Sequence, residues 1–118
     1  MEKINIQVGQ ENITGIILRN NPKIRPNFVY LHGGGNSNKD RMFSFSEPLI
    51  ASGLSLMAID FSGSGESSGS LSQSSLRKRV VEAKAVIEQY ADLDNLTICG
   101  ASMGGYVALK MLQYFPIR

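Results

Sequence analysis

Apolar and polar residues alternate over residues 4–8, which is typical of a β-strand with one buried face. A polar turn follows at residues 9–12, and residues 13–18 form a second run of strand type. Two adjacent strands joined by so short a turn predict an antiparallel hairpin at the start of the chain.

After this hairpin, short continuous apolar runs alternate with longer segments of helical period. The apolar runs at 28–31, 54–59 and 96–99 predict strands that are covered on both faces. The remaining segments predict helices at 38–52, with a possible interruption near Pro48, at 76–90 and at 103–115. In the second of these helices, apolar residues recur at spacings of four, three, four and three at Leu76, Val80, Ala83, Ile87 and Tyr90.

This order of elements predicts an α/β fold over residues 1–118. We expect about five strands, in a mostly parallel sheet with an N-terminal antiparallel hairpin. About three helices cover both faces of that sheet, because right-handed crossovers place successive helices there.

The composition narrows the function classes. A chain of 118 residues with 42% hydrophobic and 19% charged residues is ordinary for one globular domain. The net charge is +2 and the largest basic cluster, residues 77–79, is interpreted as a solvated helix face, so no nucleic-acid partner is expected.

Neither a signal core nor a membrane-length apolar run is present, which favours a cytoplasmic protein with no membrane partner. The single cysteine, Cys99, lies in a predicted buried strand and is interpreted as a small hydrophobe, and no Cys/His cluster predicts a metal site.

The segment 100–105, GASMGG, carries the strongest chemical signal in the chain. Ser102 sits between a predicted strand and a predicted helix, with Gly100 and Gly104 two places to either side. A serine in this pattern is typical of the nucleophile elbow of serine hydrolases. The turn is tight and strained, larger flanking residues would clash there, and the strain lifts the hydroxyl clear of the sheet.

A second glycine-rich segment, His32 to Gly35, follows the strand at 28–31. Backbone N–H groups of Gly34 or Gly35 could bind an oxyanion together with the N–H of Met103, the residue after the serine. The alternative is a plain glycine-rich turn between a strand and a helix. The GASMGG segment downstream favours the oxyanion interpretation.

The segment 60–69, DFSGSGESSG, follows the strand at 54–59 and is also rich in glycine. Such loops can cradle the phosphates of a dinucleotide. Here the spacing is GxGxxxG, more loop follows before any helix begins, and the chain contains no GxxxxGK[ST] motif. We therefore expect no nucleotide cofactor.

With three motifs in this order, the chain resembles the N-terminal half of an α/β-hydrolase fold protein. The resemblance covers virtually the whole chain. It implies that Ser102 is the nucleophile, that Met103 with Gly34 or Gly35 forms the oxyanion hole, and that Gly100 and Gly104 permit the elbow. It also implies close packing of the helix at Gly105, and an ester, thioester or peptide substrate that forms an acyl-enzyme. Neither a metal nor an organic cofactor is implied.

The chain departs from the family pattern after its third motif. The triad acid and histidine of the family come later in the chain, whereas this sequence stops at Arg118. His32 matches a structural position beside the oxyanion loop, with a backup base as the alternative. Asp60 matches a loop-organising aspartate, with a displaced triad acid as the alternative.

These observations leave two functional hypotheses. The chain is the N-terminal part of a serine hydrolase domain and is inactive alone, or it is a non-catalytic, degenerate α/β module that self-associates or is completed by another chain. Under either hypothesis, a sheet that ends with this sequence would leave residues 96–99 as an open apolar edge, and such edges recruit other strands. We expect self-association through this edge.

Overall fold

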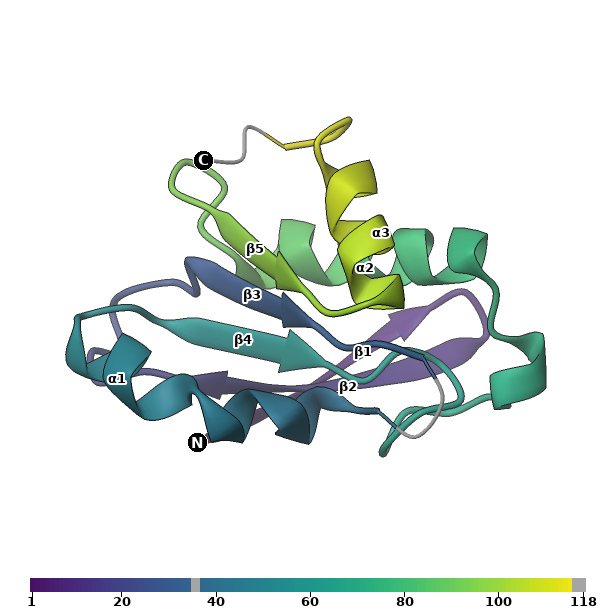
Figure 1. Ribbon diagram of the computed structural model, residues 1–118, viewed down its shortest axis with the longest axis horizontal. Helices are drawn as coiled ribbons and strands as arrows, with labels where there is room; N and C mark the ends of the chain where they lie inside the picture. The colour runs from purple at the N-terminus through teal and green to yellow at the C-terminus, as the bar shows by residue number, and fades with distance from the viewer. Residues whose placement is uncertain (35–36, 116–118) are drawn as a thin grey trace.

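The computed structural model describes residues 1–34 and 37–115 as one five-stranded sheet with helices on both sides (Figure 1). The strands are β1 (Glu2–Val8), β2 (Glu11–Leu18), β3 (Phe28–Leu31), β4 (Leu56–Ile59) and β5 (Thr97–Gly100). The α-helices are α1 (Ser46–Ala51), α2 (Leu76–Tyr90) and α3 (Met103–Met111), and two short 3₁₀ helices are η1 (Lys39–Ser44) and η2 (Leu71–Gln73).

The sheet is mixed, with strand order β1-β2-β4-β3-β5. The hairpin strands β1 and β2 are antiparallel, and β2 joins β4 in an antiparallel pair. Strand β3 runs parallel to both of its neighbours, β4 and β5. This arrangement confirms the predicted α/β fold with an N-terminal hairpin. It also brings the carboxyl ends of β3, β4 and β5 to the same end of the sheet, where the loops with the sequence motifs begin.

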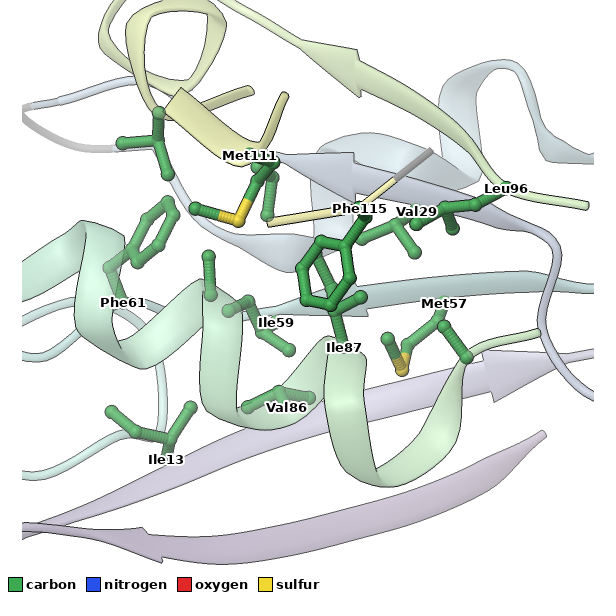
Figure 2. Close-up of a cluster of buried hydrophobic side chains, with 14 of the residues drawn as sticks. Ile13, Val29, Met57, Ile59, Phe61, Val86, Ile87, Leu96, Met111 and Phe115 are labelled. Atoms are coloured by element: carbon green, nitrogen blue, oxygen red, sulfur yellow. The ribbon is translucent and has the colours of Figure 1, made fainter. Parts of the chain in front are cut away.

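Each face of the sheet buries its own apolar cluster. Helices α2 and α3 cover one face, and η1 with α1 covers the other (Figure 1). The larger cluster lies under α2 and α3, and Figure 2 shows its side chains interlocking between sheet and helices. It includes Ile13, Val29, Met57, Ile59, Phe61, Val86, Ile87, Leu96, Met111 and Phe115. The smaller cluster comprises Ile16, Tyr30, Met42, Leu56 and Ala58. Burial on both faces explains why β3 and β4 are continuous apolar runs.

The helix predicted over 38–52 is divided in two. Its first part is the 3₁₀ helix η1, which ends at Ser44, and α1 begins at Ser46, with Phe45 between them. The interruption therefore lies at Phe45 and not at Pro48. Pro48 is in the first turn of α1, where its missing N–H leaves no intrahelical hydrogen bond unmade.

The buried stripe of α2 also differs from the prediction. Leu76, expected on the buried face, is 40% exposed, whereas Arg79, expected on a solvated face, is 1% exposed. Ala83 and Ile87 are buried as predicted. Arg79 precedes Ala83 by four residues and so lies on the same face of the helix.

Strand β5 forms one edge of the sheet within the described part of the chain, with β3 as its neighbour (Figure 1). Self-association through residues 96–99 stays a prediction, which the oligomeric state in solution would test. None of the described helices has the length and apolarity needed to span a bilayer.

Candidate functional site

Ser102 occupies a sharp turn between β5 and α3. Its φ of 55° and ψ of −114° make it the one non-glycine residue with positive φ in the described ranges. A conformation of this kind raises the free energy of the backbone by about 1–3 kcal/mol. The serine side chain is exposed and makes no capping hydrogen bond to α3, although serine is a favoured N-cap residue. The turn therefore presents to solvent a hydroxyl that bonds none of the residues described in the structure.

The glycines on either side of Ser102 allow this turn to form. A Cβ at Gly100 would collide with the backbone of Gly104 and Gly105. A Cβ at Gly104 would collide with the carbonyl oxygen of Leu31, at the end of β3. The close approach of α3 to the sheet thus occurs at Gly104. At Gly105, where the resemblance implies close packing, the nearest atom to an added Cβ would lie 3.4 Å away, so this position has room for a methyl group.

The glycine loop after β3 lies directly against the Ser102 turn. A Cβ at Gly33 would lie 3.1 Å from the carbonyl oxygen of Ala101 and 3.4 Å from the Cβ of Ser102. The Ala101 N–H donates a 3.1 Å hydrogen bond to the Leu31 carbonyl, which ties the ends of β5 and β3 together. Gly34 is half-buried and neighbours the Met103 side chain. Gly35, the other predicted oxyanion residue, lies outside the described residues.

Of the first three backbone N–H groups of α3, two are bonded within the turn and one has no intrahelical acceptor. The Gly104 N–H bonds the Ala101 carbonyl and the Gly105 N–H bonds the Ser102 carbonyl, each at 2.9 Å. Met103 is the first helical residue, so its N–H has no intrahelical acceptor. The positive end of the helix dipole adds to the attraction for negative charge at this point.

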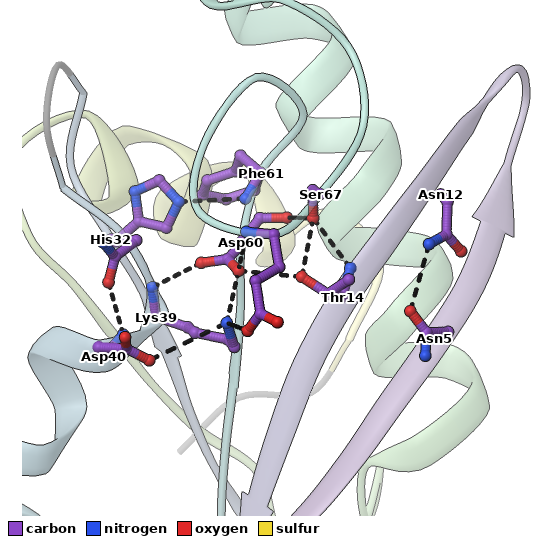
Figure 3. A network of polar contacts seen from close by, with 11 residues as sticks. Asn5, Asn12, Thr14, His32, Lys39, Asp40, Asp60, Phe61 and Ser67 are labelled. Carbon is purple, nitrogen blue, oxygen red and sulfur yellow. Dashed lines mark hydrogen bonds and ion pairs between the residues drawn. The ribbon is translucent and has the colours of Figure 1, made fainter.

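His32 is fully buried and both of its ring nitrogens are committed to the fold. Nδ1 lies 2.5 Å from the Gly33 carbonyl oxygen, which can only accept, so Nδ1 carries the proton. The Phe61 N–H donates to Nε2 at 3.0 Å, so Nε2 is unprotonated (Figure 3). Burial lowers the pKa of the imidazole, more than any neighbouring group shifts it. His32 is thus a neutral structural group, and this geometry leaves neither nitrogen for Ser102.

Asp60 follows β4 and organises a buried network of polar contacts (Figure 3). Its carboxylate accepts hydrogen bonds from the Lys39 N–H at 2.8 Å, Lys39 Nζ at 2.6 Å, the Thr14 hydroxyl at 2.9 Å and the Glu66 N–H at 3.0 Å. Burial by itself would raise the pKa of Asp60, but these donors outweigh it and hold the pKa below the usual value. The carboxylate is therefore charged and saturated, as expected of a residue that organises a loop.

Lys39 is the residue of this network that the sequence did not reveal. Its side chain is 4% exposed, and Nζ also contacts Glu66 Oε1 at 2.8 Å. Burial would lower the pKa of this lysine, but the hydrogen bonds to Asp60 and Glu66 raise it. Lys39 lies 21 residues before Asp60, and no local pattern marks a pair at that distance.

A second buried cation, Arg79, reaches the glycine loop from α2. Its guanidinium lies over the Phe61 ring, 4.9 Å from the centroid. Nε donates to the Ser74 hydroxyl at 3.1 Å, and Nη1 makes a long hydrogen bond of 3.4 Å to the Gly33 carbonyl. Burial lowers the pKa of the guanidinium. The sequence did not reveal this role, because it predicted a solvated face for residues 77–79.

Other features of the described residues lie apart from Ser102. The described residues contain no group of three His, Cys, Asp or Glu side chains that could hold a metal ion. Cys99 is a half-buried free thiol in β5. A hollow of about 400 Å³ lies between the β1–β2 turn and the start of α2, and neither the loop 32–34 nor the turn 100–104 lines it.

Comparison with known proteins agrees with this architecture. The model of the alpha/beta hydrolase fold family matches residues 26–118. The chain belongs to the alpha/beta hydrolase fold family. This match confirms the resemblance inferred from the three sequence motifs.

Individual members of the family show how far the similarity extends. The kynurenine formamidase of Danio rerio is 32% identical over 90 residues, which cover 75% of this chain and 30% of that protein. A thioesterase domain from the curacin biosynthetic pathway superposes with a TM-score of 0.80 at 24% identity, covering 94% of this chain and 40% of the other. An esterase from Exiguobacterium antarcticum gives a TM-score of 0.75 at 23% identity, and the match covers 96% of this chain and 41% of the esterase. At these identities the two structures establish the fold alone. The chain spans less than half the length of each of these relatives.

Proposed function

We propose that Ser102 is the nucleophile of a serine hydrolase that cleaves ester, thioester or peptide bonds. The observation that carries this proposal is the conformation of Ser102. The residue holds a strained positive φ between a strand and a helix, and its exposed hydroxyl does not cap that helix. These are the features of a nucleophile elbow.

In the proposed reaction, Ser102 Oγ attacks the carbonyl carbon of the substrate and forms a C–O bond. The carbonyl π electrons move to oxygen, and the resulting oxyanion accepts hydrogen bonds from the Met103 N–H and from Gly34 or Gly35. Collapse of this tetrahedral intermediate expels the leaving group with a proton and leaves an acyl-enzyme, which water then hydrolyses.

Proton transfer sets a requirement that these 118 residues do not meet. A serine hydroxyl is a weak nucleophile until a neighbouring base takes its proton. His32 is the one histidine in the sequence, and both of its nitrogens already bond within the fold. The carboxylate of Asp60 is likewise occupied by four donors. We therefore infer that the base and acid come from outside these residues, and that the 118-residue chain is inactive alone.

The formamidase relative supports an acyl substrate. A formamidase cleaves an amide, so the Danio rerio relative acts on an acyl C–N bond. An amide is cleaved by attack at a carbonyl carbon, which is the chemistry that the Ser102 turn and the glycine loop would serve.

Labelling with a fluorophosphonate probe tests the proposal. In the natural full-length polypeptide that contains this sequence, the probe should label the wild type and fail to label Ser102→Ala. Ser72→Ala is a matched control, because Ser72 is exposed on η2 and far along the chain from the turn. Labelling of Ser102→Ala at the wild-type level would refute the proposed nucleophile.

The commitment of His32 and Asp60 also favours a second candidate, a non-catalytic α/β module completed by another chain. The same experiment separates the two. A module of this kind would show no labelling in the wild type, even at full length and with its partner present.

A further inference from the structure

The Gly33 carbonyl oxygen is held by two buried donors from different parts of the chain. His32 Nδ1 lies 2.5 Å from it and Arg79 Nη1 lies 3.4 Å from it. Both side chains are inaccessible, with exposed fractions of 0% for His32 and 1% for Arg79. The carbonyl therefore points into the protein, toward an imidazole N–H and a cation.

The direction of this carbonyl determines the direction of the next N–H. A peptide unit is planar, and in the trans form the C=O of one residue and the N–H of the next point in opposite directions. The described residues contain no cis peptide bond. Drawing the Gly33 carbonyl inward thus turns the Gly34 N–H away from His32 and Arg79.

Such a constraint is needed because both residues of this peptide are glycines. Without a Cβ, glycine adopts a wide range of backbone angles, so the Gly33–Gly34 peptide has little intrinsic preference for one orientation. A flipped peptide would point the Gly34 N–H at the guanidinium and at the Nδ1–H, where like partial charges repel. It would also leave two buried donors without their acceptor, which is unfavourable.

Burying a guanidinium is unfavourable unless its charge is compensated. The buried carboxylate of Glu82, three residues later on α2, attracts this cation and opposes the effect of burial on its pKa, but its Oε1 accepts from the Ser62 N–H. The hydrogen bonds of Arg79 within the described residues go to a hydroxyl and a carbonyl. An apolar side chain at this place on α2 would pack against Phe61 without that penalty. The arginine instead supplies a donor to the glycine loop and a positive charge behind it.

We propose that Arg79 is a positioning residue which, together with His32, holds the Gly33 carbonyl inward so that the Gly34 N–H is available to the oxyanion. This inference rests on the proposed function, because it concerns the oxyanion site of the same reaction. It adds a residue on α2 that does not touch the substrate and acts through the orientation of one peptide unit.

Steady-state hydrolysis of p-nitrophenyl acetate by the full-length protein tests this role. Arg79→Met removes the donor and the charge, and Arg79→Lys retains the charge. The matched control is Arg77→Met, two residues earlier on α2, where the side chain is exposed. Loss of one oxyanion donor lowers kcat by about 100-fold to 1,000-fold, so a misoriented donor should lower it by about 10-fold to 100-fold. We expect this loss in Arg79→Met with KM nearly unchanged, partial rescue in Arg79→Lys, and wild-type kcat in Arg77→Met.

Two substitutions of His32 provide an independent readout. An asparagine amide can occupy the place of Nδ1 and donate to the Gly33 carbonyl, whereas a glutamine amide reaches the place of Nε2 and can accept from Phe61. We expect His32→Asn to retain a higher kcat than His32→Gln. If Arg79→Met does not fold, this pair tests the orientation of the Gly33 carbonyl, and a kcat of Arg79→Lys below that of the wild type tests the arginine.

Equal kcat values in folded Arg79→Met and Arg77→Met would overturn the proposal, as would equal losses in His32→Asn and His32→Gln. These results are distinct from a failure of the proposed function. If Ser102→Ala abolishes probe labelling while Arg79→Met leaves kcat unchanged, the nucleophile stands and only the positioning role is wrong.

Discussion

The Asp60 network and the Ser102 turn both lie at the carboxyl end of the sheet, yet their polar groups differ in how far they are hydrogen-bonded within the fold. The Asp60 carboxylate is fully buried and accepts four hydrogen bonds. The Ser102 hydroxyl is exposed and does not cap the helix that it precedes. The network uses its polar groups to hold loops together, whereas the turn raises its backbone energy and keeps a hydroxyl free. At this site, a polar side chain is therefore a better candidate for a catalytic role when it is not already hydrogen-bonded within the fold.

Removing the charge of Asp60 should give the largest loss of stability. Asp60→Asn leaves the Lys39 ammonium buried beside a neutral amide, and breaking a buried ion pair in this way lowers the free energy of unfolding by about 3–5 kcal/mol. Urea denaturation of the full-length protein measures the change. The control is Asp40→Asn, since Asp40 is exposed and its Oδ1 lies 3.9 Å from Lys39 Nζ. We expect that variant to lose less than about 1 kcal/mol. Equal losses in the two variants would show that the network is not the stabilising feature.

Crowding the Ser102 turn should give the next largest effect. Gly104→Ala places a methyl group against the Leu31 carbonyl, and overpacking of this kind lowers stability by about 1–3 kcal/mol. Gly105→Ala, one residue later on α3, has room for the methyl group and should change stability by no more than about 1 kcal/mol, in the stabilising direction. Thermal unfolding of the two variants makes the comparison. A Gly104→Ala protein as stable as Gly105→Ala would mean that α3 does not approach the sheet closely at Gly104.

Relieving the strain at Ser102 should give the smallest effect, and of opposite sign. Ser102→Gly removes the side chain that disfavours a φ of 55°, whereas Ser102→Ala keeps it. After the greater chain entropy of glycine in the unfolded state is taken into account, we expect Ser102→Gly to be more stable than Ser102→Ala by about 1 kcal/mol. Urea denaturation of both proteins tests this. If the alanine variant were the more stable, the positive φ would not be a source of strain.

Features that depend on neighbours in the sequence were predictable. The alternation over residues 4–8 and the apolar run at 28–31 correspond to β1 and β3. The GASMGG pattern located the strand-turn-helix at Ser102, because the restriction at Gly100 arises within the turn itself, from the backbone of Gly104 and Gly105. The break at Phe45 was not predictable in the same way, since both η1 and α1 satisfy a helical pattern and differ only in their winding.

Features that depend on distant residues were missed. Lys39 meets Asp60 across 21 residues and Arg79 meets Gly33 across 46. The sign of a charge says nothing about which loop it will reach, so the sequence alone predicts a solvated face for the basic run at 77–79. Only the packing of α2 on the sheet showed that one of the three is buried.

The register between β3 and β5 has a further consequence, for insertions and deletions. Leu31 pairs with Gly100, and the glycine loop and Ser102 follow these two residues directly. Their spacing therefore depends on the backbone ladder between the two strands. One residue inserted into either strand would move its loop by about 3.3 Å relative to the other, more than the length of a hydrogen bond. Lineages that carry this site should thus keep the lengths of β3 and β5 unchanged.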